Sequence, residues 1–86
     1  ENPDLEIEAM CGLSELYAAH GRATEAFAPV EPLLARDPSS PRIASAAAYA
    51  LAAQGDRARA LAVLDAALAE HPREPALLSA KARVYF

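Results

Sequence analysis

This chain of 86 residues has little of what sheets, disulfide frameworks and membrane spans require. It contains one cysteine, no tryptophan and few β-branched or aromatic side chains. A single cysteine, Cys11, cannot form an internal disulfide, so a disulfide-stabilised fold is excluded. No apolar run approaches the roughly 20 residues that span a bilayer, so we expect no membrane insertion. The scarcity of β-formers, together with abundant alanine and leucine, predicts an all-α protein.

The chain also lacks an excess of basic residues, since its formal net charge is −4. Residues 1–38 hold eight acids and two bases, whereas residues 39–86 hold four acids and six bases. Binding to nucleic acid depends largely on neutralising phosphates, so we expect no nucleic-acid partner. The uneven charge has two readings: a solvated surface, or a field that orients head-to-tail stacking or a charged partner.

A repeat with a period of 34 residues organises the sequence. Sliding the chain by this interval places Gly21 on Gly55, Ala26 on Ala60, and Pro38 on Pro72. A period of this length with a helix–turn–helix in each copy is typical of helical solenoids. We therefore predict one domain over residues 1–86, an antiparallel helix-pair solenoid of about two and a half repeats and five helices. The repeats are expected at about 7–40 and 41–74, with a half-repeat at 75–86.

The first helix is expected to start near Pro3, which suits a first helical turn, and to stop at His20-Gly21. Its apolar residues recur at steps of three and four, which places them on one face. The residues predicted to face inward are Ile7, Met10, Leu13, Leu16 and Tyr17.

The second helix is expected over residues 23–36, but two prolines interrupt it. Pro29 and Pro32 each remove a backbone donor and crowd the carbonyl four residues earlier, at about 3 kcal/mol or more in a helix interior. We therefore predict a kink or a break near residues 28–32.

The remaining helices have clear boundaries. Ser40-Pro41 offers a serine cap with proline at the first helical position, which predicts a helix from Pro41 to Ala53. Asp56 is expected to cap a helix over residues 57–70, and a last helix is expected from Pro75. The apolar residues of this last helix are Leu77, Leu78, Ala82 and Tyr85.

These landmarks resemble the tetratricopeptide repeat family. In the first repeat the matching residues are Met10, Leu13-Ser14, Tyr17, Gly21, Ala26, Val30 and Pro38. In the second they are Ala44, Ala47-Ala48, Leu51, Gly55, Ala60, Leu64, Ala67 and Pro72. Leu33 and Lys81 depart from the family pattern, which has Ala and Leu there.

The resemblance implies a concave groove lined by the first helix of each pair. The charged, polar and aromatic groove residues that it implies are Glu8, Cys11, Glu15, Arg42, Ser45, Tyr49, Ser79, Arg83 and Phe86. The alanines that it implies are Ala18, Ala19, Ala52, Ala53 and Ala76. Independently of the family, Glu8, Cys11 and Glu15 share one helix face, and so do Arg42, Ser45 and Tyr49. Tyr49 is the preferred contact, since an exposed aromatic is a typical anchor for a partner.

The resemblance implies a non-catalytic module that binds a protein, either an extended peptide or a partner helix. The alternatives are a structural spacer or self-association segment of a longer solenoid, with self-association through the C-terminal helix, and a regulatory domain fused to an enzyme. A subtype of the family clamps C-terminal carboxylates of chaperones through Lys and Asn, but Cys11 and Glu15 stand at those positions. The related pentatricopeptide repeats read RNA, a role that the acidic charge disfavours.

Catalysis, cofactors and metal sites are not predicted. His20 and His71 stand at helix ends, where an imidazole interacts with free carbonyls, and Cys11 lacks a neighbouring base. No metal-ligand cluster or glycine-rich phosphate loop is present in the sequence. We expect a soluble segment of a longer protein, with a composition suited to a bacterium and the cytoplasm favoured as its compartment.

Overall fold

The computed structural model describes residues 3–85, apart from the side chains of Pro3, Asp4, Ala23 and Tyr85. Within this range the chain forms helices and no strand, which confirms the predicted all-α class. The helices are α1 (Pro3–Ala19), α2 (Ala23–Ala26), α3 (Glu31–Arg36), α4 (Pro41–Ala53), α5 (Arg57–Glu70) and α6 (Pro75–Tyr85). No helix of the described chain has the length and apolar character that crossing a membrane requires.

The predicted count of five helices is wrong, because the second helix is divided into α2 and α3. The break covers residues 27–30, where the Val30 amide donates to the Phe27 carbonyl at 3.2 Å, three residues back. Pro29 lies within this turn. Pro32 lies in the first turn of α3, where a helix leaves its amides unpaired and a proline is tolerated. The prolines therefore cause the break that the sequence predicts near residues 28–32.

The two glycine turns have the same geometry one repeat apart. Gly21 and Gly55 have positive φ angles of 75° and 86°. The Arg22 amide donates to the Tyr17 carbonyl at 2.8 Å, and the Asp56 amide donates to the Leu51 carbonyl at 2.9 Å. Both bonds span five residues around a left-handed glycine, as in a Schellman motif. Glycine is required here because other L-residues disfavour this backbone conformation.

Side-chain caps fix the starts of the two long central helices. The Ser40 hydroxyl accepts from the Ile43 amide at 3.5 Å, and the Asp56 carboxylate accepts from the Arg59 amide at 3.2 Å. Each cap satisfies an amide that the helix itself leaves free. These caps, with Pro41 in the first turn of α4, explain why both starts were predictable from the sequence.

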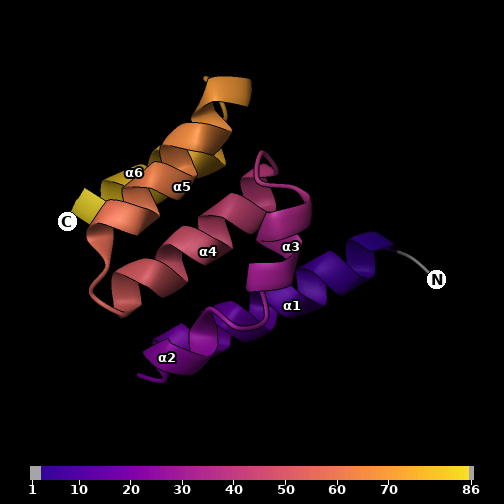
Figure 1. Ribbon diagram of the computed structural model, residues 1–86, viewed down its shortest axis with the longest axis vertical. Coiled ribbons are helices and arrows are strands. Elements are labelled where there is room, and N and C mark those ends of the chain that lie inside the picture. Colours follow the sequence, from indigo (N-terminus) through magenta and orange to yellow (C-terminus); the bar gives the residue numbers. More distant parts are fainter. Residues whose placement is uncertain (1–2, 86) are drawn as a thin grey trace.

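Helix α4 lies at the centre of the molecule, with α1 on one side and α5 and α6 on the other (Figure 1). Seven of its thirteen residues are buried, and five of these are alanines. Small side chains allow neighbouring helix axes to approach closely. The buried residues of α4 are Ile43, Ala44, Ala46, Ala47, Ala48, Ala50 and Leu51.

The predicted inward face of α1 is wrong in part. Leu13 and Leu16 are 38% and 54% exposed, whereas Cys11 and Ser14 are completely buried. Helix α1 has apolar residues on more than one side, so apolar spacing alone does not identify the side that meets α4. Small residues, Cys11 and Ser14, occupy the side where the helices meet.

The last helix, α6, is covered on one side only. Leu77 and Val84 are buried, but Leu78 is 50% exposed and Ala82 is also exposed. Of the apolar residues named from the sequence, Leu77 is therefore covered and Leu78 and Ala82 are not, because α4 and α5 lie on only one side of α6. The side chain of Tyr85, the fourth of these residues, lies outside the described part of the chain.

Candidate partner-binding groove

A groove runs across the first helix of each helix pair. It is lined by residues of α1, α4 and α6, and its volume is about 270 Å³. The 34-residue period explains this arrangement, because equivalent positions in successive repeats face the same side. The lining residues are Glu15, Arg42, Ser45, Tyr49, Ala76, Ser79, Ala80 and Arg83.

The groove brings together residues that the family resemblance implies. Of the nine charged, polar and aromatic ones, Glu15, Arg42, Ser45, Tyr49, Ser79 and Arg83 line it. Glu8 is not among the lining residues, but it lies beside them through an ion pair with Arg42. Phe86 lies outside the described residues. Of the implied alanines, Ala76 lines the groove, whereas Ala18, Ala19, Ala52 and Ala53 are not among its lining residues. Ala80 lines it without having been predicted, since nothing in its residue type indicates a contact.

Arg42 joins α4 to α1 through three charged hydrogen bonds. Its Nε donates to Glu8 at 2.6 Å, and its two terminal nitrogens donate to the Glu15 carboxylate at 3.0 and 3.1 Å. The hydrogen bonds to Glu15 raise the pKa of Arg42 most, and partial burial opposes them. A bidentate pair fixes geometry as well as charge. The sequence carried a signal that we did not use: Glu8 and Arg42 have opposite charges one period apart.

Toward α6, the groove exposes an aromatic ring, Tyr49, and a positive charge, Arg83. Tyr49 is 39% exposed, and Arg83 is exposed without an ion-pair partner among residues 3–85. Glu8 and Glu15 together outweigh Arg42 by one negative charge at the α1 end. The groove therefore has a net acidic end on α1 and a basic end on α6, with an aromatic ring between them.

Cys11 does not contribute to the groove surface, which corrects its predicted place there. Its side chain is completely buried, and its thiol faces the Arg42 carbonyl oxygen at a sulfur–oxygen distance of 3.9 Å. Burial raises the pKa of the Cys11 thiol, an effect that nearby Arg42 partly opposes. A protonated, buried thiol is a poor nucleophile, so Cys11 acts as a packing residue between α1 and α4.

The other candidate residues stand apart from the groove. His71 caps the end of α5, and His20 follows α1 at the glycine turn. Within the described range, no group of three or more His, Cys, Asp or Glu side chains is arranged to hold a metal ion. Lys81 of α6 pairs with Asp65 of α5 at 2.9 Å and so helps to join these two helices.

Comparison with families of known proteins finds a match. The sequence model described as tetratricopeptide repeat matches residues 17–84, which is most of the chain. No curated protein and no solved structure matches it.

Proposed function

This chain belongs to the tetratricopeptide repeat family, and we propose that it is a non-catalytic module that binds a protein partner in the α1–α4–α6 groove. Repeats of this family are in general protein-interaction modules without catalytic activity. The observation that carries the proposal is the groove itself, in which three equivalent helices contribute one continuous lining. The partner enters as an extended peptide or as one face of a helix.

Tyr49 and Arg83 are the expected anchors for the partner. Tyr49 is a large, partly exposed ring between two charged ends, and such side chains contribute most to binding energy when a partner covers them. Arg83 is exposed and offers a planar, permanently charged donor for a carboxylate. Arg42 has a different role, because its ion pairs with Glu8 and Glu15 hold α1 against α4.

The test uses peptides selected for binding to this chain. A phage-displayed library of random 12-residue peptides is selected on the wild-type chain, and enriched peptides are measured by calorimetry. Tyr49→Ala and Arg83→Glu are each expected to weaken binding by about tenfold or more, a loss of about 1.4 kcal/mol.

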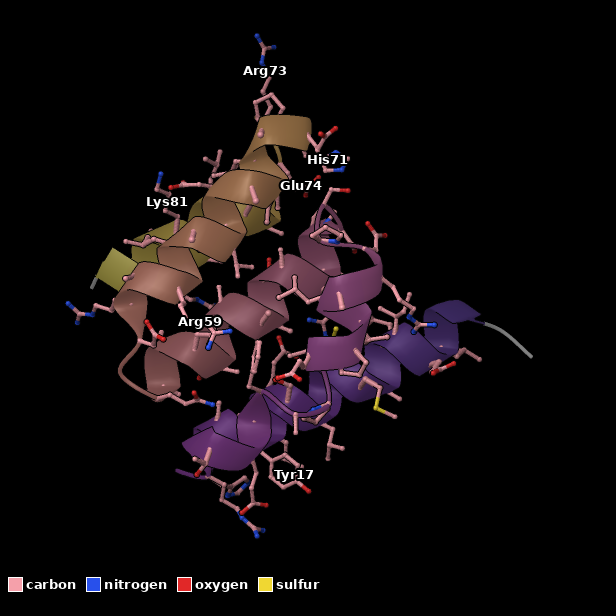
Figure 2. All side chains as sticks on the ribbon, in the orientation of Figure 1. Tyr17, Arg59, His71, Arg73, Glu74 and Lys81 are labelled. Atoms are coloured by element: carbon pink, nitrogen blue, oxygen red, sulfur yellow. The ribbon has the colours of Figure 1, made fainter. Side chains whose placement is uncertain are left out.

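Arg73→Glu is the matched control. It reverses the same charge as Arg83→Glu, but Arg73 projects from the turn between α5 and α6, away from the groove (Figure 2). Its affinity for the peptides is expected to stay near that of the wild type. Peptides that bind all four proteins with equal affinity would overturn the proposed groove.

A further inference from the structure

The side of α1 that faces away from α4 carries exposed apolar residues. We call this surface, Ala9, Gly12, Leu13 and Leu16, the outer face of α1. All four residues are exposed, and Leu16 is the most exposed leucine among them. Leu5, which is 68% exposed, extends the same side toward the start of the helix.

The repeat shows what kind of surface covers this face elsewhere in the molecule. Adding 34 to each position gives Ile43, Ala46, Ala47 and Ala50 of α4, which are all 0–1% exposed. Adding 34 again gives Leu77, Ala80, Lys81 and Val84 of α6, which are buried or half-buried. The preceding helices pack against both: α1 contacts α4, and α4 and α5 contact α6. The outer face of α1 therefore corresponds to a surface that another helix of the stack covers in α4 and α6.

Helix α6 presents such a side. Cys11 and Ser14, on the α1 side that is covered within the chain, are completely buried, whereas their counterparts Ser79 and Ala82 on α6 are exposed. Leu78, next to them, is 50% exposed. We call Leu78, Ser79 and Ala82 the end face of α6.

Charge distinguishes the ways in which these two faces can pair. Helix α1 has acidic residues beside its outer face, Glu6 and Glu8, and no basic residue in its last turn. Helix α6 has no acid and carries the exposed Arg83, whereas its Lys81 lies on the covered side and is paired with Asp65 of α5. Pairing α1 with α1, or α6 with α6, would bring like charges together, whereas pairing α1 with α6 brings opposite charges together.

From these observations we propose that the outer face of α1 docks on the end face of α6 in a second copy of this chain. The contact continues the helix stacking of α1, α4 and α6 from one copy into the next. It shares Ser79 and Arg83 with the groove, whereas Leu16 and Leu78 lie outside the groove lining, so substitutions at these two leucines test the junction separately.

The existing ion pair between α1 and α4 predicts a specific contact across this junction. Glu15 and Arg42 are paired at 3.0 Å between successive repeats. The residue equivalent to Glu15 on α6 is Arg83, and the residue equivalent to Arg42 on α1 is Glu8. Stacking in the same register therefore places Arg83 of one copy beside Glu8 of the next, which is the same pair with its charges exchanged.

Such a contact is small and gives weak association. A single helix stacked on another buries less than the roughly 800 Å² per partner of a standard interface, so we expect a dissociation constant of about 0.1–1 mM. Because the two faces differ, the contact is head-to-tail and does not close at the dimer.

Sedimentation velocity from about 10 μM to 2 mM tests the proposal on the 86-residue chain. The wild type is expected to sediment as a 9.1 kDa monomer at the lowest concentration. At the highest concentration it is expected to form species larger than a dimer. Leu16→Glu removes one face and Leu78→Glu removes the other, so each variant alone is expected to stay monomeric. Mixed in equal amounts, they are expected to form a dimer that grows no further, because each retains one intact face.

Other outcomes overturn the proposal. A wild type that stays monomeric at 2 mM shows that the faces do not pair. Association of Leu78→Glu alone indicates α1–α1 pairing, and association of Leu16→Glu alone indicates α6–α6 pairing. Circular dichroism checks that each variant is folded, and Leu13→Glu with Ala82→Glu provides a second pair of variants if one of the first is not.

The exchanged ion pair has its own test. Arg83→Glu is expected to weaken association by about threefold to tenfold, and 0.5 M salt is expected to weaken the wild type but not this variant. Arg57→Glu makes the same change of net charge on α5 and is expected to associate as the wild type does. Equal association of all three proteins would exclude the predicted register.

Discussion

At the scale of single residues, glycine stabilises the fold in the two turns and destabilises it inside α1. Gly21 and Gly55 occupy left-handed turns, whereas Gly12 lies inside α1 with nothing within 4 Å of an added Cβ. A left-handed backbone costs other L-residues roughly 1–2 kcal/mol, but glycine inside a helix is itself unfavourable by about 1 kcal/mol relative to alanine.

Two single substitutions test this difference. Gly55→Ala is expected to lower the free energy of unfolding by about 1–2 kcal/mol, because alanine must adopt the positive φ angle of 86°. Gly12→Ala, the matched control, is expected to raise it by up to about 1 kcal/mol. Urea unfolding at low protein concentration measures both. Equal effects of the two changes would contradict the assignment of Gly55 as a required turn residue.

The buried thiol of Cys11 predicts a dependence of stability on pH. Its pKa is raised in the folded chain above the ordinary 9.0, chiefly by burial. The unfolded chain therefore loses this proton first as the pH rises. The stability contributed by the protonated thiol is complete below pH 9 and is lost as the pH increases through the raised pKa.

Urea unfolding between pH 8 and pH 10.5 measures this effect, and Cys11→Ala provides the comparison. The wild type is expected to lose more stability over this range than the variant does. Cys11 is also expected to react with a chromogenic disulfide reagent only as fast as the chain unfolds. Identical pH profiles for the two proteins, together with rapid reaction of the native thiol, would show that Cys11 is accessible.

At the scale of helices, the interrupted second helix still delivers the residues that the repeat requires. Val30 and Leu33 are buried, as are their counterparts Leu64 and Ala67 in the continuous helix α5. The break between α2 and α3 therefore changes the backbone and preserves the core positions. Its cause is local, since Pro29 lies in the turn and Pro32 in the first turn of α3.

Replacing both prolines tests this account. Pro29→Ala with Pro32→Ala is expected to join α2 and α3 into one helix over residues 23–36 and to increase the helical signal in circular dichroism. Backbone chemical shifts of residues 27–30 are expected to move to helical values. The equivalent change at Pro41, which starts α4, is the control and is expected to leave helix content unchanged. An unchanged signal from the double variant would assign the break to packing instead of proline.

Helix boundaries were more predictable from the sequence than helix faces. Ser40 and Asp56 cap the starts of α4 and α5, and these signals depend only on neighbouring residues. The inward side of α1 depends on where α4 lies, and Leu13 and Leu16 offered an apolar stripe that α4 does not cover. Local signals therefore predicted where α4 and α5 begin, but tertiary packing decided which side of a helix is buried.

At the scale of the whole molecule, the family resemblance implied the groove, and the 34-residue period explains its lining. Equivalent positions of successive repeats reach the same side, so Glu15, Tyr49 and Arg83 line one groove although they are far apart in the sequence. The ion pairs of Arg42 and the burial of Cys11 were not predicted, because they depend on the distance between α1 and α4. The binding role of the groove remains a prediction.

The most direct measurement is an amide chemical-shift titration of the ¹⁵N-labelled chain with a peptide selected on it. The account predicts that the largest shifts fall on groove residues of α1, α4 and α6, with Tyr49 and Arg83 among them, and that α3 and the turn around Arg73 stay unchanged. Shifts concentrated on α3 and α5, with Tyr49 and Arg83 unaffected, would contradict it.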